Sequence, residues 1–308
     1  MTEASTPMDD AFHTPDDSRW WTETVWFSWI VPERGLIAYV YPVFRPNVGI
    51  QFGGVVVFGD KAVSPWEEPV NAFDWHQPLP PDLDLRDMTL ASGLSIRVEK
   101  PGELYRVQYS GRDTEFDLTV RTAGPALVTR SATPPLGAGH VDQMCHVTGH
   151  MTLDSETIAV DCLSIRDRAA WGVRQDGRQP RVHYSWGAAS ADEYFLTAGI
   201  HRDGVDTLTT GFFMRHGKWS PVVSGERRVR RNDAGQVTHV EIAGRDELGR
   251  ELSVSGKATD RHLFEGYPGM ICWTGLIEWD LNGQIAWGED QDVWSPGGWR
   301  RHRLSSAR

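Results

Sequence analysis

Runs of β-branched and aromatic residues follow one another along almost the whole chain, separated by short segments rich in Gly, Pro, Asn and Asp. LIAYVYPVF (36–44) and ELSVSGKA (251–258) are typical runs, and turn sequences such as LNG (281–283) lie between neighbouring ones. This composition and spacing predict antiparallel strands joined by tight turns. No long stretch repeats apolar residues at the spacing of a helix face, so we predict an all-β protein built as barrels or sandwiches.

The chain is long enough for two β domains of ordinary size. Its 308 residues contain a polar segment with Gly and Pro, RQDGRQPRVH (174–183), between two strand-rich halves. We therefore predict a flexible N-terminal tail over 1–17, an N-terminal domain over 18–176 and a C-terminal domain over 177–308. Residues 64–92 are rich in proline and alternate little, so we expect a long irregular excursion there, either a wall of a site or a packed surface loop.

The charge balance argues against nucleic acid as a partner. The sequence carries 31 Lys and Arg against 42 Asp and Glu, a formal net charge of −11, whereas binding to nucleic acid or anionic membranes needs a basic surface. No run of about 18 apolar residues is present to span a bilayer. The N-terminus lacks the regions of a secretory signal, and three widely spaced cysteines fit a reducing compartment. We expect a cytoplasmic protein without stable membrane insertion, and a homodimer is left open.

Sequence motifs of common cofactor-binding and catalytic sites are missing. There is no glycine-rich loop for a dinucleotide or phosphate and no HExxH motif for zinc, so we expect no cofactor, and there is no nucleophile elbow. His140, Asp142, His146 and His150 fall on alternating positions of one predicted strand and would share one face. The outer pair would lie too far apart to bind one ion, so we expect a polar wall and no metal site.

The densest charged segment is DCLSIRDRAAWGVR, in which a predicted strand should turn through Asp167 and Arg168. Arg166, Arg168 and Arg174 would keep the Asp167 carboxylate ionised. An ionised carboxylate is a poor general acid at neutral pH. We therefore favour a structural clamp, with an indole packed under an arginine, over a direct catalytic role.

Acidic side chains near tryptophan are the candidates for proton transfer. The sequence has 14 tryptophans, and several of them surround Glu23 in SRWWTETVWFSW (18–29). Aromatic surroundings disfavour a charged carboxylate and raise its pKa, which makes it a proton donor; a strand edge with Glu23 in water is the alternative. In the predicted hairpin over 277–294, which contains Glu278, most acids should be solvated, while one could point inward.

Several segments together resemble a known group of proteins. They are PERG with RPN (32–47), GHVDQMCHVTGHMTLDSETIAVD followed by RDRAAWGVR (139–174), and GLIEWDLNGQIAWGE (275–289). Over roughly residues 18–300 the chain is similar to the two-domain lipocalin-like superfamily of carotenoid 1,2-hydratases, AttH-like proteins and Diels–Alderases. The resemblance implies two lipocalin-like antiparallel β-barrel or half-barrel domains packed side by side, with an apolar pocket near their junction. It also implies cofactor-independent chemistry on hydrophobic unsaturated substrates.

Two sequence elements of the superfamily match individual residues of this chain. An H-x-[ED]-Q element of the superfamily matches His140, Asp142 and Gln143. An R-D-x-(S/A)-W-G-x-R element matches Arg166, Asp167, Trp171, Gly172 and Arg174, with one additional alanine before the tryptophan. Because the second element recurs in relatives of unlike activity, the resemblance favours a structural role for it at the domain junction.

The leading hypothesis is a lyase that adds or removes water across a carbon–carbon double bond of a hydrophobic terpenoid, polyketide-like or aromatic small molecule. A cyclase or isomerase of a polyene and a non-catalytic carrier of an apolar ligand are the alternatives. The expected proton donors are Glu23 and Asp142, followed by Glu278. The side chains expected to contact the substrate are Trp21, Trp26, His140, Gln143, His146, Trp171, Trp186, Trp273 and Trp287, and those expected at the junction are Arg166, Asp167, Arg168 and Arg174.

Overall fold

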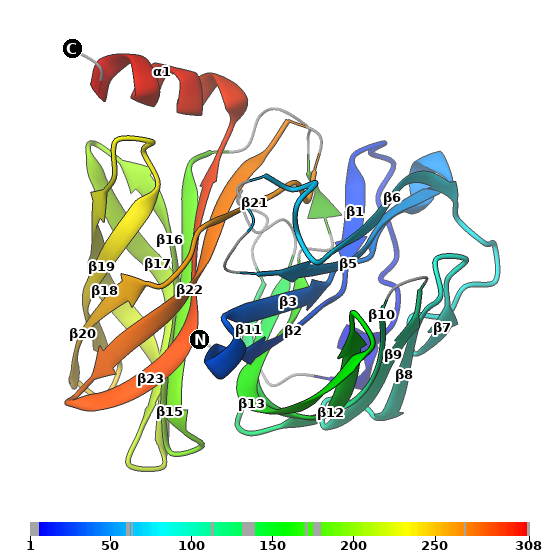
Figure 1. The fold of residues 1–308 in the computed structure, drawn as a ribbon, viewed down its shortest axis with the longest axis horizontal. Coiled ribbons are helices and arrows are strands. Elements are labelled where there is room, and N and C mark those ends of the chain that lie inside the picture. Colours follow the sequence, from blue (N-terminus) through cyan, green and yellow to red (C-terminus); the bar gives the residue numbers. More distant parts are fainter. Residues whose placement is uncertain are drawn as a thin grey trace. The chain divides into compact units, whose positions relative to one another are not determined.

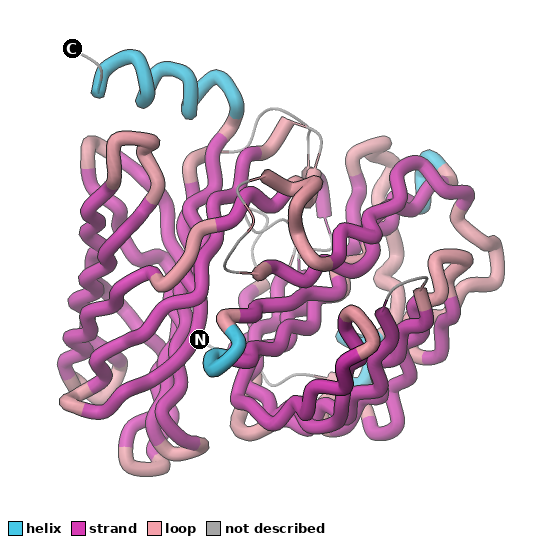
Figure 2. The backbone as a smooth tube through the Cα atoms, in the orientation of Figure 1, coloured by secondary structure: helices cyan, strands magenta, loops and turns pink. Residues whose placement is uncertain are grey.

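A computed structural model describes residues 6–59, 62, 64–111, 114–130, 139–169, 172–174, 180–267 and 269–306. Nearly all of their regular structure is strand (Figure 2), which confirms the all-β prediction. The chain divides into two compact units. Unit 1 contains Met1–Val31, Leu36–Phe58 and Glu68–Arg174, and unit 2 contains Pro32–Gly35, Gly59–Glu67 and Gln175–Arg308.

Unit 1 is a curled antiparallel sheet. Its strands are β1 (Trp21–Thr24), β2 (Trp26–Val31), β3 (Leu36–Val40), β4 (Val43–Arg45), β5 (Ile50–Phe58), β6 (Val70–Pro78), β7 (Asp87–Thr89), β8 (Leu94–Lys100), β9 (Leu104–Ser110), β10 (Thr114–Thr122), β11 (Leu127–Thr129), β12 (His140–Leu153), β13 (Glu156–Ala169) and β14 (Gly172–Val173). They pair in the order β14-β1-β4-β5-β3-β2-β13-β12-β10-β9-β8-β7, with β6 beside β5 and β11 beside β12. Short 3-10 turns occur in unit 1 at Pro7–Asp10 and Pro46–Val48, and a third, Pro32–Arg34, belongs to unit 2.

Two segments that the sequence predicts to be irregular contain ordered structure. Asp9 and Asp10 are only 1% and 5% exposed, and Asp10 Oδ1 lies 3.0 Å from Arg166 Nη1. The expectation of a flexible tail is therefore wrong for this stretch, because its acids pair with arginines that are distant in sequence. The expectation of an irregular excursion is also wrong in part, since β6 and β7 lie within it and β6 pairs along β5.

Unit 2 contains a closed barrel. Its strands are β15 (Val182–Ser190), β16 (Glu193–Arg202), β17 (Val205–Arg215), β18 (Lys218–Arg231), β19 (Val237–Asp246), β20 (Glu251–Ala258), β21 (His262–Phe264), β22 (Ile271–Leu281) and β23 (Gln284–Trp294). They pair in the order β20-β19-β18-β17-β16-β15-β23-β22-β21, and the pairing of β20 with β22 closes the sheet on itself. The predicted LNG turn joins β22 to β23, because Asn282 and Gly283 adopt the positive φ angles of 55° and 80° that a two-residue hairpin needs.

Side chains fill the barrel at the end near this turn. The Trp279 ring packs edge-on against Phe195, with ring centroids 5.1 Å apart. A Cβ at Gly187 would lie 2.6 Å from the Trp279 ring, and one at Gly256 would lie 2.4 Å from it, so both glycines leave room for the indole. This end of the barrel is thus a packed apolar core.

A helix lies across the other end of the barrel (Figure 1). It is α1 (Pro296–Ser306), whose Trp299 ring centroid lies 5.7 Å from that of Trp273 and 5.5 Å from that of Trp294. The sequence does not predict α1, because two glycines near its start and a weak apolar periodicity hide the helical pattern. The described residues form no helix with the length and apolar character that crossing a membrane requires.

Candidate functional site

The candidate site lies where β12 and β13 pair in unit 1. His140 and Asp142 are two residues apart on β12, and the register places Asp142 opposite Asp167 of β13 and Asp167 opposite Trp26 of β2. Cross-strand partners share a face of a sheet. On the other face, Arg166 pairs with Phe27, a residue of the hydrophobic core. The two aspartates, the histidine and Trp26 therefore gather on the face opposite the core.

An imidazole lies between two carboxylates in this group. His140 Nδ1 is 2.9 Å from Asp142 Oδ2, and His140 Nε2 is 3.1 Å from Asp167 Oδ2. Burial of the ring favours its neutral form, but Asp142 and Asp167 outweigh burial and raise the pKa of His140 to about 10. At neutral pH the group holds an imidazolium that can supply a proton.

Asp167 is the member of the group that a bound molecule can reach most easily. Its side chain is 16% exposed, compared with 6% for His140 and 1% for Asp142. Its Oδ1 atom is itself buried and has no hydrogen-bond partner among the described residues. Asp142, with Oδ2 2.9 Å from Nδ1, can therefore stabilise the charged ring, His140 can hold the proton, and Asp167 can exchange it with a ligand.

Aromatic rings lie beside this acid–base group. The Trp26 ring packs against Tyr39 with centroids 4.2 Å apart and edge-on against Tyr41 with centroids 5.0 Å apart. Arg174 Nη1 donates a hydrogen bond of 3.3 Å to the hydroxyl of Tyr41. Trp26, the cross-strand neighbour of Asp167, brings an indole near the carboxylate, an arrangement suited to a ligand that is apolar at rest and develops positive charge during a reaction.

His140, Asp142 and Asp167 are also residue types that bind metal ions. One ligand atom each from His140, Asp142 and Asp167 lies within 4.8 Å of the others. However, the two carboxylates contact different nitrogens of the same ring. A single ion could bind only one of those nitrogens, so this geometry is better suited to a protonated ring held between two carboxylates than to a metal ion.

The structure corrects the prediction for Glu23. Its side chain is fully buried, and its Oε2 accepts a hydrogen bond of 2.6 Å from Arg168 Nη2. The backbone N–H of His13 donates to Oε1 at 2.8 Å. Burial alone would raise the pKa of Glu23, but Arg168 and His13 outweigh it and lower the pKa below its ordinary value. Glu23 is therefore an ionised structural partner of Arg168, and the expected proton donor with a raised pKa is wrong.

The predicted arginine clamp around Asp167 is also wrong. β13 does not turn at Asp167 but continues to Ala169, so neighbouring side chains point to opposite faces. Arg166 and Arg168 point away from Asp167, toward the core face. The charge partner of Asp167 is His140.

One signal in the sequence could have predicted that Asp142 and Asp167 lie opposite each other. β12 and β13 form a hairpin whose turn is Asp154–Ser155, with positive φ at both residues. Residues at equal distance from a two-residue turn pair with each other. That rule places Asp142 opposite Asp167 without any knowledge of the tertiary structure.

Three predicted contact residues of unit 1 lie elsewhere. His146 shares the face of His140 but lies about 20 Å farther along the strand, where it is half exposed and contacts Asp161 at 2.5 Å. Gln143 lies on the core face, where it accepts a hydrogen bond of 2.8 Å from an arginine. Trp21 packs with Val128 in a small separate apolar cluster. None of these three side chains joins the acid–base group.

The predicted residues of unit 2 do not form one group. Trp186 is fully buried and donates to a buried glutamate at 3.1 Å. Trp273 lies beside α1 at the barrel end, while the half-buried Trp287 pairs with the exposed Glu278 near the hairpin turn. Trp171 lies outside the described residues.

The acids of the last hairpin are more buried than predicted. Glu289, Asp290 and Asp292 are 0%, 3% and 1% exposed, so the expectation that most acids of this hairpin are solvated is wrong. Glu278 and Asp280 are exposed. The difference arises because partners from distant strands, above all arginines, meet the buried carboxylates inside unit 2.

Residues 6–290 match the model of a protein family described as a domain of unknown function, DUF7064. The chain belongs to the DUF7064 family. A comparison with curated proteins finds no match.

Solved structures share the fold of this DUF7064 chain. One is kievitone hydratase from Nectria haematococca, with 11% identity, a TM-score of 0.56, and coverage of 95% of this chain and 93% of that chain. Another is an AttH-like protein from Nitrosomonas europaea, with 13% identity, a TM-score of 0.55, and coverage of 95% of this chain and 97% of that chain. At this identity the likeness shows the fold, and it is the two-domain lipocalin-like fold that the sequence resemblance implies.

Proposed function

We propose that the chain is a cofactor-independent hydro-lyase that adds water to, or removes it from, a carbon–carbon double bond of a hydrophobic small molecule. The observation that carries the proposal is the imidazole of His140 between the carboxylates of Asp142 and Asp167, with Trp26 as the cross-strand neighbour of Asp167. A hydratase among the solved structures of the same fold supports the class of reaction.

The proton begins on His140 in this mechanism. An apolar ligand placed against Asp167 would remove water from its carboxylate and favour the protonated acid, so the proton moves from His140 Nε2 to Asp167. Asp142 remains beside Nδ1, where its carboxylate stabilises the charged form of the ring. The neutral ring that remains can take a proton back at the end of the cycle.

Hydration then needs two bond-forming steps. The π electrons of the double bond take the proton from Asp167 and form a new C–H bond, which leaves a cation on the neighbouring carbon. The face of Trp26 stabilises that cation. A water molecule forms the C–O bond and releases one proton to the Asp167–His140 pair, which restores the starting state. Dehydration follows the same steps in reverse.

The test uses a panel of unsaturated hydrophobic compounds of terpenoid, polyketide-like and aromatic type that includes kievitone, with products analysed by mass spectrometry. We expect a product heavier or lighter by one water. Asp167→Asn should slow turnover by about 100-fold or more, as for loss of a general acid. Asp161→Asn is the matched control, because it removes an exposed aspartate from a histidine on the same sheet and should leave turnover unchanged.

Other outcomes would contradict the proposal in distinct ways. A product of unchanged mass would indicate a cyclase or isomerase. A ligand that binds with quenching of tryptophan fluorescence and is recovered unchanged would indicate a carrier. Full turnover in Asp167→Asn would remove Asp167 from the reaction.

A further inference from the structure

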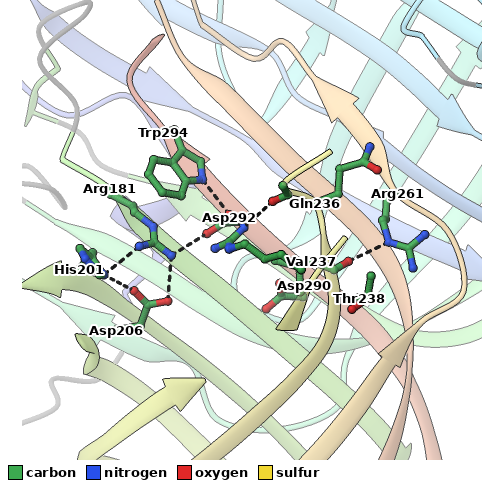
Figure 3. A network of polar contacts seen from close by, with 12 residues as sticks. Arg181, His201, Asp206, Gln236, Val237, Thr238, Arg261, Asp290, Asp292 and Trp294 are labelled. Atoms are coloured by element: carbon green, nitrogen blue, oxygen red, sulfur yellow. Dashed lines mark hydrogen bonds and ion pairs between the residues drawn. The ribbon is translucent and has the colours of Figure 1, made fainter. Parts of the chain in front are cut away.

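The strand β18 divides its charged side chains between the two faces of the unit 2 barrel. Residues 226–231 read ERRVRR, and successive side chains of a strand point to opposite faces. Arg227 points inward, with Nη2 2.6 Å from one buried aspartate and Nη1 2.9 Å from another. Arg181 belongs to the same group of arginines and aspartates (Figure 3). These inward charges are paired within unit 2, whereas Arg228 and Arg230 point outward and are exposed.

Two rows of side chains cross the outer face of the barrel from β18 to β22. The strand register gives one row of Arg228, Glu241, Ser255 and Asp280, and a second row of Arg230, His239, Lys257 and Glu278. Cross-strand neighbours share a face of a sheet, so these eight side chains form one surface, the four-strand face. Each row begins with an arginine on β18 and ends with a carboxylate on β22. The four-strand face therefore has a basic edge and an acidic edge.

The four-strand face is hollowed between its edges. One hollow of about 510 Å³ is lined by residues that include Arg228, Ser255 and Asp280. A second hollow of about 440 Å³ is lined by residues that include Arg230 and Glu278, and it shares Ser255 and Asp280 with the first. Each hollow touches both edges, so the basic and the acidic side chains border one common space that is open to a partner.

The charges at the two edges are accessible. Arg228 contacts Glu226, yet the Arg228 side chain is 70% exposed. Arg230 and Glu278 are exposed and form no ion pair with any residue that the structure describes. On β23, beside the acidic edge, Ile285 is 69% exposed and lines the second hollow. A surface with the opposite charges in reverse order would match both edges at once.

The four-strand face is itself such a surface. In a symmetric dimer whose two-fold axis lies in the contact plane, parallel to the strands and between β19 and β20, β18 of one copy faces β22 of the other. Arg228 then lies opposite Asp280 of the partner subunit, and Arg230 lies opposite Glu278 of the partner subunit. The symmetry repeats both contacts, which gives four ion pairs.

The middle of the contact is also free of facing like charges. The same axis brings Glu241 opposite Ser255 of the partner subunit, whose hydroxyl can donate a hydrogen bond to a carboxylate. It brings Lys257 opposite His239 of the partner subunit, whose neutral imidazole can accept a hydrogen bond. Every position of the two rows therefore has a compatible counterpart.

We propose that the four-strand face is a contact between two copies of this chain. The outer strands of the face lie three strand spacings, or about 14 Å, apart. The contact is thus smaller than a standard interface, so the dimer is weak and reversible. The net charge of −11 makes two copies repel at long range, but salt at about 0.15 M screens that repulsion beyond about 8 Å, while the ion pairs act at contact. The dimer does not depend on the proposed lyase activity, because the face shares no residue with the acid–base group.

The first test is sedimentation equilibrium of the full-length protein from about 5 to about 500 µM. We expect a monomer–dimer equilibrium in about 0.15 M NaCl and at least tenfold weaker association in about 1 M NaCl, because salt screens exposed ion pairs. A monomer at every protein concentration in the lower salt would overturn the proposal. Association of equal strength in both salts would also overturn it, since that result indicates an apolar contact elsewhere.

Two charge-reversal variants then locate the contact. The double variant Arg228→Glu with Arg230→Glu makes both edges acidic, and the double variant Glu278→Arg with Asp280→Arg makes both edges basic. Each variant alone should be monomeric, because like charges then face each other. An equal mixture should form heterodimers, because every acidic edge meets a basic edge.

The matched control is Arg202→Glu with Lys218→Glu. It changes the net charge as much as the acidic variant does, but at exposed positions outside the four-strand face, and should dimerise like the wild type. Circular dichroism checks that each variant is folded. Dimers of either reversed variant alone, or a mixture of folded variants without heterodimers, would overturn the proposal. If a reversed variant does not fold, the salt dependence of the wild type decides.

Discussion

Replacing Asp142 by asparagine removes one of the two carboxylates that hold the His140 imidazolium without changing the size of the side chain. In the wild type, the pKa of His140 rises from 6.5 to about 10, which corresponds to about 5 kcal/mol of preference for the charged ring. Burial of the ring acts against this preference, so the two carboxylates together contribute more than that amount.

The size of the effect follows from the two contacts. They are nearly equal in length, 2.9 Å to Asp142 and 3.1 Å to Asp167. If each carboxylate provides about half of the preference, Asp142→Asn lowers the pKa of His140 to about 8 or below, because burial still acts on the ring. The same reasoning applies to Asp167→Asn.

Imidazole ¹⁵N resonances measured from acid to alkaline pH report this pKa directly, and a His140→Gln variant assigns the signals. Asp161→Asn is the control, because Asp161 contacts the half-exposed His146 and should leave His140 unchanged. A wild-type His140 that titrates near 6.5 would refute the reasoning. A pKa that stays at about 10 in Asp142→Asn would refute the assigned role of Asp142.

Further predictions concern stability. The pKa of His140 in the folded protein lies above its unfolded value, so its contribution to the free energy of unfolding is fully present below pH 6.5 and is lost as pH rises toward about 10. The free energies of unfolding of the wild type and His140→Gln, measured with urea across this window, should converge at the alkaline end. Glu23→Gln leaves the buried Arg168 without its anion and should lower the free energy of unfolding by about 3 kcal/mol, and an unchanged urea midpoint would contradict the pair. Gly199→Ala places a Cβ 2.0 Å from the carbonyl oxygen of Thr207 and should cost about 1–3 kcal/mol by thermal unfolding, whereas Gly297→Ala, with a nearest contact of 3.5 Å, should not destabilise.

Local patterns in the sequence predict much of the fold. Strand runs, short turns and the near absence of helical periodicity are enough for an all-β chain, because strand pairing between neighbours needs only alternation and a turn. The LNG turn and the hairpin of β12 and β13 are examples. The hairpin of β12 and β13 also brings Asp142 opposite Asp167, so the centre of the candidate site lies within the thirty residues from His140 to Ala169.

The tertiary structure alone decides the charge state of the buried side chains. Glu23 has aromatic neighbours in sequence, which predict a raised pKa, but Arg168 reaches it from a strand 145 residues later. Asp10 and Arg166 meet across 156 residues, and Arg227 and Asp290 across 63. A pKa depends on charges within a few ångströms, and in a sheet protein these come from strands that are remote in sequence. The sequence by itself therefore determined where strands form and which neighbours pair, while only the folded chain determined which acids are ionised, buried or available for chemistry.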